Sequence, residues 1–391
     1  MARTYRYISG DSHLEIDSKN WIARVPAEHR DRAPRLVRLP NGGDAWLVEG
    51  APLRQNAADI YGGKGRDAWQ PFGQRYEDTP GTGPGSQRLR EQDVDGIDAE
   101  VLFPGQQAGP RLWRNIADDD AYRAVVRAYN DWLIEDYCSA DPERLIGVGV
   151  IPWTGLDDAI DELVHCANKG FKAVVLGIFP SGKGHPTPED DRFWAAAVDS
   201  GLAITVHVEF DRNGPRGGPL FRYPREPKDL RSGSGVSGLV EQVTNAKFCR
   251  LGAVNAMQLV FAGVFDRFPS LRIFFAENQI GWIPFFLEMA DVRYDRHIAW
   301  AERLLDVKPL PRLPSEYVRE HCYWGFQHDR VGIELRRHLG VDRIIWSTDF
   351  PHQESDWPNS LEVLSEGLAG VPESEQRKIV AENCIDFFHL V

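Results

Sequence analysis

The sequence predicts an α/β fold: a single (β/α)8 TIM barrel domain formed by residues 1–391, with a long insertion after strand 1 and another after strand 5. Short apolar segments alternate with segments of helical period, which predicts a parallel sheet covered by helices. Several apolar segments run directly into Asp, His or Glu, as expected where barrel strands end at a common mouth. Residues 10–13 (Gly-Asp-Ser-His) are not the glycine-rich phosphate loop that an open doubly wound sheet needs after its first strand.

The strands and helices follow in order along the chain. Eight segments have the length and apolar content of barrel strands: residues 7–10, 99–103, 145–151, 171–176, 202–207, 271–277, 321–326 and 343–347. Helical periods predict helices at residues 119–139, 157–168, 188–200, 254–268, 282–300, 331–339 and 373–388. Eight such units are enough to close one barrel.

Two segments interrupt the alternation. Residues 17–95 follow the first strand and residues 211–237 follow the fifth, and both are rich in Gly, Pro and Arg. Insertions of this length border the mouth of a barrel, and we expect the first to serve as a lid or as an oligomer contact.

Composition and charge exclude several classes of protein. Hydrophobic residues make up 42% of the chain and charged residues 26%, as in a soluble globular protein, and no apolar run is long enough to cross a bilayer. The first residues lack a secretory signal, so we expect a cytoplasmic protein. A net charge of −13 without a basic face argues against nucleic acid as a partner. The five cysteines show no paired spacing, which indicates reduced thiols.

The strand ends bring candidate metal ligands together. Asp11 and His13 alternate along an extended chain and therefore share a face. Other strand ends supply His207, Glu277 and Asp349, with His352 close behind. Imidazoles and carboxylates suit zinc, manganese or iron. Such an ion lowers the pKa of a bound water from above 15 to about 7, which generates a nucleophile at neutral pH.

Each of these residues also has an ordinary structural interpretation. His207 fits a buried core histidine, Asp349 fits a turn cap, and Glu277 fits an ion pair with an arginine. Their joint occurrence at strand ends favours the metal site.

The same residues carry a resemblance to a known family. The motifs are Asp-Ser-His at 11–13, His207, Phe-Ala-Glu-Asn at 275–278 with Gly-Trp-Ile-Pro at 281–284, and Ser-Thr-Asp-Phe-Pro-His at 347–352. In this order they resemble the amidohydrolase-related family that includes aminocarboxymuconate semialdehyde decarboxylase. The resemblance implies a distorted (β/α)8 barrel, a homodimer or related-subunit oligomer, and a divalent metal held by Asp11, His13, His207 and Asp349.

The sequence departs from the family pattern at two positions. Asp11 stands where the founding pattern has a histidine, similar to the resorcylate-type decarboxylases, and Glu277 stands where many members have a histidine. The resulting excess of carboxylates favours a second cation, because adjacent buried carboxylates raise each other's pKa. We therefore expect one divalent metal ion (Zn, Mn or Fe) with room for a second, completed by Glu277 and His352.

Hydrolysis of a small organic substrate is the leading functional prediction. A metal-activated water would attack an ester, amide, thioester or activated C–C bond, with Asp349 taking the proton of the water and Glu277 or His352 serving the leaving group. One alternative is non-oxidative decarboxylation of a small carboxylic acid, with Arg212, Arg216 or Arg222 clamping its carboxylate. Two others are oxygen activation at a dinuclear iron or manganese site and a non-catalytic barrel subunit.

Overall fold

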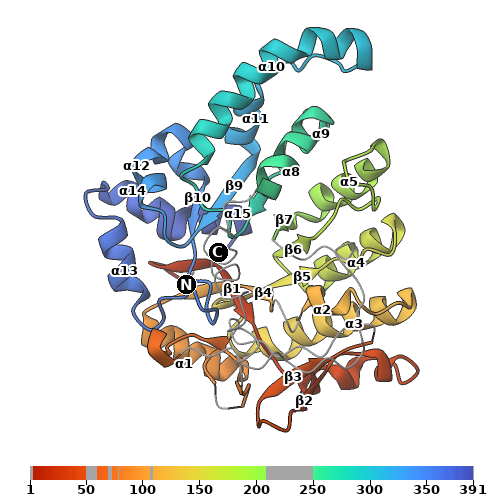
Figure 1. The fold of residues 1–391 in the computed structure, drawn as a ribbon, viewed down its shortest axis with the longest axis vertical. Coiled ribbons are helices and arrows are strands. Elements are labelled where there is room, and N and C mark those ends of the chain that lie inside the picture. Colours follow the sequence, from red (N-terminus) through yellow and green to blue (C-terminus); the bar gives the residue numbers. More distant parts are fainter. Residues whose placement is uncertain are drawn as a thin grey trace, which may run out of the picture.

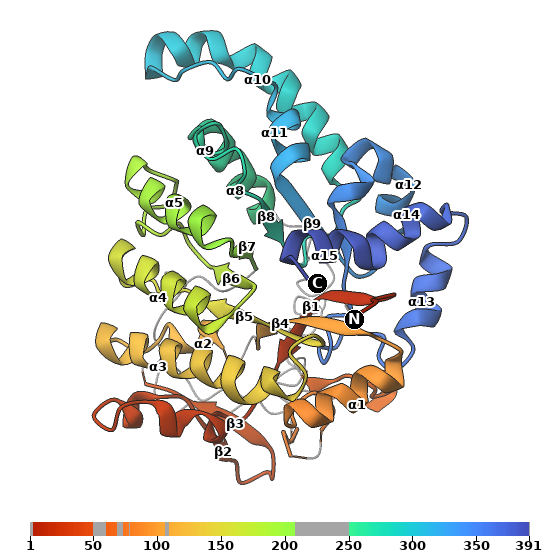
Figure 2. The ribbon, with the colours of Figure 1, turned by 180° about the vertical axis from the view of Figure 1, so that it is seen from behind.

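A barrel of parallel strands forms the centre of the protein. The computed structural model describes residues 3–49, 60–68, 73–77, 79–105, 109–207 and 250–390. Within these ranges, eight strands form one sheet in the order β1-β4-β5-β6-β7-β8-β9-β10, and helices surround it (Figures 1 and 2). The strands are β1 (Ile8–Leu14), β4 (Ala99–Pro104), β5 (Leu145–Val150), β6 (Ala173–Leu176), β7 (Ala203–Val206), β8 (Ile273–Phe275), β9 (Cys322–Phe326) and β10 (Ile344–Trp346). The predicted (β/α)8 barrel is confirmed.

Backbone hydrogen bonds connect the first strand to the segment that follows the last one. The amide of His13 donates to the carbonyl of Phe350 (2.8 Å), and the amide of Asp349 donates to the carbonyl of Asp11 (3.0 Å). Ser9 adds a side-chain contact, because its Oγ accepts from the amide of Thr348 (2.9 Å). These bonds close the barrel at the strand ends that carry the candidate site.

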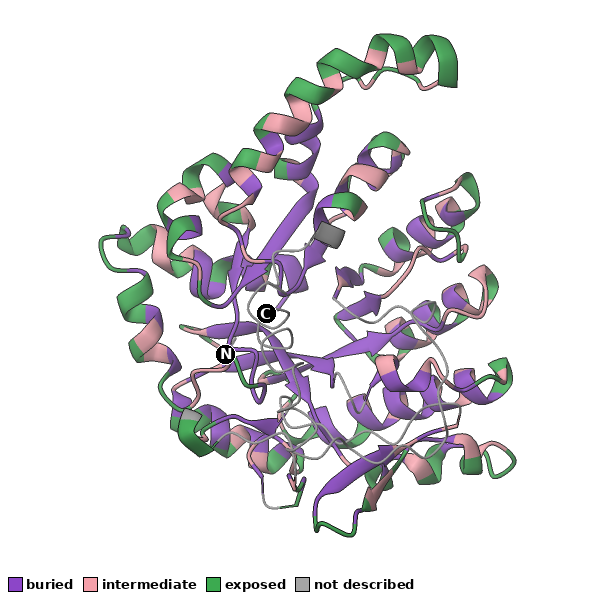
Figure 3. Ribbon diagram, in the orientation of Figure 1, coloured by how far each residue is buried: buried purple, intermediate pink, exposed green. Residues whose placement is uncertain are grey.

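Burial along the strands follows from this closure. Every residue of the eight barrel strands is buried except the half-buried Val206, whereas the outer faces of the helices are exposed (Figure 3). Strands covered on both faces by helices and by the barrel interior are expected to be continuously apolar rather than alternating.

The covering helices overlap the predicted ones, but three of the predicted segments are interrupted. The segment predicted at 254–268 divides into two helices on either side of Ala262 and Gly263. Turns of π-helix, which hold one extra residue per turn, break the segments predicted as continuous helices at 119–139 and 373–388. The helices are α3 (Asp119–Trp132), α4 (Leu156–Lys169), α5 (Asp191–Ser200), α8 (Arg250–Phe261), α9 (Val264–Arg267), α10 (Ile283–Leu305), α12 (Arg330–Leu339), α14 (Glu373–Arg377) and α15 (Asn383–Phe388).

The sequence of α4 explains how such a helix forms. Ala159, Leu163 and Cys166 recur at helical spacing and are buried against the barrel. Asp157 and Asp158 lie in the first turn, where negative charge favours the helix dipole. The helix ends at Gly170, whose φ of 89° lies in the left-handed region that glycine adopts without a Cβ clash.

Several elements were not predicted. The insertion at 17–95 contains an antiparallel hairpin and a full helix, for which the sequence analysis predicted no helix or strand. These elements are β2 (Arg35–Arg38), β3 (Asp44–Leu47) and α1 (Gly85–Asp95), and outside the insertion α2 (Pro110–Trp113), α11 (Pro314–His321) and α13 (Ser360–Gly367). The proposed lid or oligomer role of the insertion stays a prediction. The second insertion, with Arg212, Arg216 and Arg222, lies outside the described residues.

Four of the five cysteines lie within the described residues. Cys138, Cys166, Cys322 and Cys384 are free and buried, and burial raises the pKa of each thiol, that of Cys138 to about 12. Among the helices in these ranges, none combines the length and the apolar character needed to cross a membrane.

Candidate metal centre

The first strand delivers two site residues through a bulge. Ser9 pairs with Glu100 and Ser12 pairs with Leu102, so β1 holds one residue more than β4 between these pairs. Gly10 makes the bulge possible, because a Cβ at this position would lie 2.3 Å from Cγ2 of Ile345 on β10. Asp11 and His13, on either side of Ser12, are both fully buried.

The other strand ends deliver the remaining residues. His207 directly follows β7, Glu277 follows β8 by two residues, and Asp349 follows β10 by three. The backbone at Glu277 (φ 54°) and Asp349 (φ 55°) is left-handed, a conformation that costs a non-glycine residue about 1–3 kcal/mol. Such backbone at two buried acidic residues is typical of functional sites, where the surrounding structure holds a side chain in one direction.

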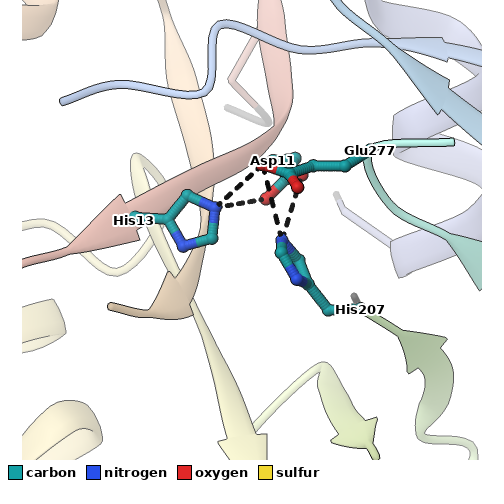
Figure 4. Close-up of side chains that lie close together, drawn as sticks. All are labelled: Asp11, His13, His207 and Glu277. Carbon is teal, nitrogen blue, oxygen red and sulfur yellow. Dashed lines mark ion pairs between the residues drawn. The ribbon is translucent and has the colours of Figure 1, made fainter. Parts of the chain in front are cut away.

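Four of the predicted side chains converge on one point (Figure 4). The carboxylate of Asp11 lies between two imidazoles, with Oδ1 3.5 Å from Nε2 of His13 and Oδ2 3.5 Å from Nε2 of His207. Oε1 of Glu277 lies 3.7 Å from the first imidazole and 3.9 Å from the second. One ligand atom from each of these residues lies within 4.8 Å of the others, a spacing that can hold a metal ion.

A second group shares His13 and Glu277 with the first. Oδ1 of Asp349 lies 3.3 Å from Nε2 of His13 and 2.9 Å from Nδ1 of His352. The rings of His13 and His352 stack with centroids 4.0 Å apart. Again, one ligand atom from each of the four residues lies within 4.8 Å of the others. All six residues predicted for the site are therefore together.

The carboxylate oxygens and imidazole nitrogens of this cluster suit a metal cation. Within the described part of the chain, both carboxylate oxygens of Asp11 and Nε2 of His13 are buried and make no hydrogen bond. Leaving a buried charged group without a hydrogen bond or a counter-ion is costly, and buried charges are normally paired or coordinate metals. A divalent ion between these atoms would satisfy them and offset the negative charge of the three carboxylates.

The environment of His13 prepares Nε2 for such an ion. Nδ1 lies 3.1 Å from the carbonyl of Pro104, which favours the tautomer with the proton on Nδ1 and leaves Nε2 as the ligand atom. Burial and the neighbouring His352 lower the pKa of His13, but the carboxylates of Asp11, Asp349 and Glu277 outweigh them and raise it to about 9. Without an ion, Nε2 therefore holds a proton at neutral pH, and a bound metal would take the place of that proton.

Two contacts around the cluster were not predicted as part of the site. Glu15 continues the alternation of Asp11 and His13, and its Oε1 lies 3.4 Å from Nε2 of His352. Arg88 of α1 donates hydrogen bonds to the carbonyls of His13 and Phe350. The alternation was a usable signal for Glu15, whereas Arg88 belongs to a helix that was not predicted. Glu209, two residues after His207, lies outside the described residues.

Comparison with known proteins decides the family. A sequence model of the family described as Amidohydrolase matches residues 67–390. The chain belongs to this family. The resemblance found in the motifs is confirmed, and this amidohydrolase is an enzyme of the metal-dependent superfamily.

Curated relatives of this amidohydrolase are decarboxylases. Gamma-resorcylate decarboxylase of Rhizobium sp. (strain MTP-10005) is 26% identical over 361 residues, which cover 86% of this chain and 98% of the relative. The 2-amino-3-carboxymuconate-6-semialdehyde decarboxylase of Dictyostelium discoideum is 22% identical over 305 residues, covering 78% of this chain and 76% of the relative.

Solved structures share the fold of this chain. An amidohydrolase from Mycobacterium avium subsp. paratuberculosis K-10 superposes with a TM-score of 0.73 at 19% identity, covering 99% of this chain and 98% of the other. A dihydroxybenzoic acid decarboxylase from Polaromonas sp. JS666, with bound manganese and the inhibitor 2-nitroresorcinol, superposes with a TM-score of 0.61 at 19% identity, covering 99% and 98%. Related structures thus bind manganese, and the buried cluster here can hold a divalent metal.

Proposed function

We propose that this amidohydrolase is a metal-dependent, non-oxidative decarboxylase of a small phenolic carboxylic acid. The observation that carries the proposal is the match to gamma-resorcylate decarboxylase over 86% of the chain. The convergence of imidazoles and carboxylates at the strand ends supports it. The predicted hydrolase activity is not confirmed, and the relatives favour the decarboxylase alternative over it.

The ligand roles are proposed from the predicted set, whereas in the structure Glu277 completes the group around Asp11, His13 and His207 and Asp349 belongs to the second group. Asp11, His13, His207 and Asp349 would hold the primary ion. When bound, the ion supplies a Lewis acid that orients an acidic substrate and offsets its negative charge. Manganese, iron and zinc all accept this mixture of carboxylate and imidazole ligands.

In this proposal Asp349 delivers the proton that decarboxylation needs. A proton from its carboxyl group adds to the substrate carbon that carries the carboxylate. The bond from that carbon to the carboxylate then breaks, its electron pair returns to the ring, and carbon dioxide leaves. Oδ1 of Asp349 lies 2.9 Å from Nδ1 of His352, so this imidazole can return a proton to it after each turnover.

Glu277 and His352 define a second position. Together with His13 and Asp349 they offer ligand atoms within 4.8 Å of one another, and we propose that this group can take a second ion at high metal concentration. Elemental analysis during metal loading tests this part separately. A content that never exceeds one ion per chain would rule out the second position and leave the first intact.

The decisive experiment separates the reaction types. Protein loaded with Mn²⁺ is incubated in D₂O with 2,6-dihydroxybenzoate and 5-carboxyvanillate, the acids processed by solved relatives, and in parallel with a panel of esters, amides and thioesters. We expect release of carbon dioxide and a product that carries one deuterium at the former carboxylate carbon. The variant Asp349→Asn should lose this activity, whereas Asp95→Asn, a buried carboxylate of α1 that accepts from the amide of Ser360, should keep it.

Other results would support the alternatives. Hydrolysis of the ester, amide or thioester panel without carbon dioxide would contradict decarboxylation. Oxygen consumption by the iron-loaded protein would favour oxygen activation, and inactivity with every metal and substrate class would favour a non-catalytic subunit.

A further inference from the structure

Arg88 is a buried cation next to the candidate metal centre. It lies on α1, its side chain is 1% exposed, and it pairs with Glu100 of β4. Nε of the guanidinium lies 2.6 Å from Oε2 of Glu100, and Nη2 lies 3.3 Å from Oε1. The planar guanidinium is thereby fixed in one orientation.

The same guanidinium holds two segments that carry proposed ligands. Nη1 donates to the carbonyl of His13 (3.2 Å), and Nη2 donates to the carbonyl of Phe350 (3.0 Å), the residue after Asp349. Cζ of the guanidinium lies 4.5 Å from the centroid of the Phe350 ring. One side chain therefore links the backbone of the first strand to the backbone of the turn after the last.

Glu100 is itself held in place. It accepts a hydrogen bond from Oγ of Ser12 (2.9 Å) and another from Nε2 of Gln92 (2.8 Å). Ser12 lies between the two proposed ligands of the first strand, and its hydroxyl also contacts that of Thr348, next to Asp349, at 3.0 Å. The Arg88–Glu100 pair thus belongs to a buried network that reaches both sides of the metal centre.

We propose that Arg88 is a positioning residue that sets the spacing between His13 and Asp349 and so tunes the affinity for the metal. This inference rests on the proposed metal centre. Residues that orient metal ligands in this way typically change metal affinity by about 10- to 100-fold when they are mutated.

Electrostatic repulsion alone predicts the opposite change in metal affinity when Arg88 is replaced. A guanidinium cation repels a divalent ion, so replacing it with a neutral side chain would strengthen metal binding if charge were its only influence. If its role is to hold the two backbone segments, the same replacement weakens binding. The direction of the change in affinity therefore separates the two explanations.

The test uses the full-length, metal-depleted protein titrated with Mn²⁺ and followed by electron paramagnetic resonance. We expect Arg88→Gln to weaken Mn²⁺ binding about 10- to 100-fold and to alter the spectrum of the bound ion. Arg88→Lys keeps the charge but cannot span both carbonyls, and it should rescue only part of the affinity. The double variant Arg88→Gln/Glu100→Gln removes both charges together and avoids an unpaired buried carboxylate, and it should show the same weakening.

A matched control comes from another arginine that combines an ion pair with a carbonyl contact. Nη2 of Arg336, on α12, lies 2.6 Å from Oε2 of Glu375, and Nη1 donates to the carbonyl of Ile333 (2.7 Å). The variant Arg336→Gln should leave Mn²⁺ affinity within about twofold of the wild type, because its contacts do not involve the ligand segments.

The outcomes are distinguishable. A folded Arg88→Gln or double variant, judged by near-ultraviolet circular dichroism, that binds Mn²⁺ as tightly as the wild type or more tightly would overturn the inference. Loss of the folded state in all three variants would show a purely structural role and would also overturn it. Failure of the wild type to bind Mn²⁺ would instead refute the proposed metal centre.

Discussion

The backbone amide of Asp349 donates a hydrogen bond to the carbonyl of Asp11 over 3.0 Å. This bond joins the end of the last strand to the first strand at the point where both supply proposed ligands. The hydrogen bond that closes the barrel therefore also brings the proposed ligands of the two segments together. An ion held between these segments should stabilise the closed barrel.

Metal binding should therefore increase stability. At a free Mn²⁺ concentration 100 times the dissociation constant, binding to the native state alone raises the free energy of unfolding by about 2.7 kcal/mol. Urea unfolding of chelator-treated protein, with and without Mn²⁺, measures the difference. The variant Asp11→Asn should show no such gain. An equal gain in this variant would mean that the ion binds elsewhere.

The two acidic residues of the first cluster should behave differently. Asp11 contacts both imidazoles and is central to the primary position, so Asp11→Asn should leave the purified protein without metal. Glu277→Gln should retain one ion but lose activity or the second ion, because the four proposed primary ligands remain while the second group loses a carboxylate. Elemental analysis gives the metal content of each variant. Retention of a full complement by Asp11→Asn would remove this residue from the ligand set.

Gly10 should be intolerant of a side chain. The Cβ of an alanine there would lie 2.3 Å from Cγ2 of Ile345, and we expect Gly10→Ala to destabilise the fold by about 1–3 kcal/mol. Gly184 has open space at its Cβ position, so Gly184→Ala should change stability by less than about 0.5 kcal/mol.

A double-mutant cycle tests whether the clash with Ile345 causes the destabilisation in Gly10→Ala. Ile345→Ala removes the clashing methyl group, so the combination with Gly10→Ala should be less destabilised than the sum of the single variants. Strict additivity in denaturant unfolding would show that the cost of Gly10→Ala comes from another contact.

The contact between His328 and Asp356 should make stability depend on pH. The hydrogen bond to Asp356 raises the pKa of His328, while partial burial opposes the shift. A histidine with a raised pKa in the folded state contributes its stabilisation fully below its unfolded pKa of about 6.5 and loses it as the pH rises through the folded value. The difference in thermal midpoint between the wild type and His328→Gln should thus be largest near pH 6 and vanish in alkaline buffer, around pH 9.

The partner residue provides the control. Asp356→Asn should abolish the same pH dependence, and adding His328→Gln to it should change nothing further. A difference between the wild type and His328→Gln that stays constant across this pH range would contradict an ionic contact.

The candidate site could be read from the sequence because its residues follow apolar strands. Apolar runs end at His207, Glu277 and Asp349, and parallel strands bring such ends to one mouth of the barrel. The left-handed backbone at Glu277 and Asp349 could not be read in this way, because each is an ordinary acidic residue rather than a glycine. The sequence left hydrolysis and decarboxylation as alternatives, because one metal and one ligand set serve several chemistries.

Helix α1 shows why part of the fold was missed. Its buried face consists of Gly85, Arg88, Glu91, Gln92 and Asp95, while its Val94 is 63% exposed. A search for apolar residues at helical spacing cannot find a helix that buries polar residues. The hairpin of β2 and β3 did carry a signal, because residues 41–43 (Asn-Gly-Gly) are typical of a turn between strands.

The left-handed backbone at Glu277 and Asp349 has a consequence for directed evolution of this enzyme. Glycine adopts this conformation more readily than glutamate or aspartate, so replacing either acid with glycine would relax the local chain and also remove a charged neighbour of the others. A screen for heat resistance alone would then favour variants that have lost their proposed chemistry. Thermostable descendants should be sought with an activity selection applied at every round.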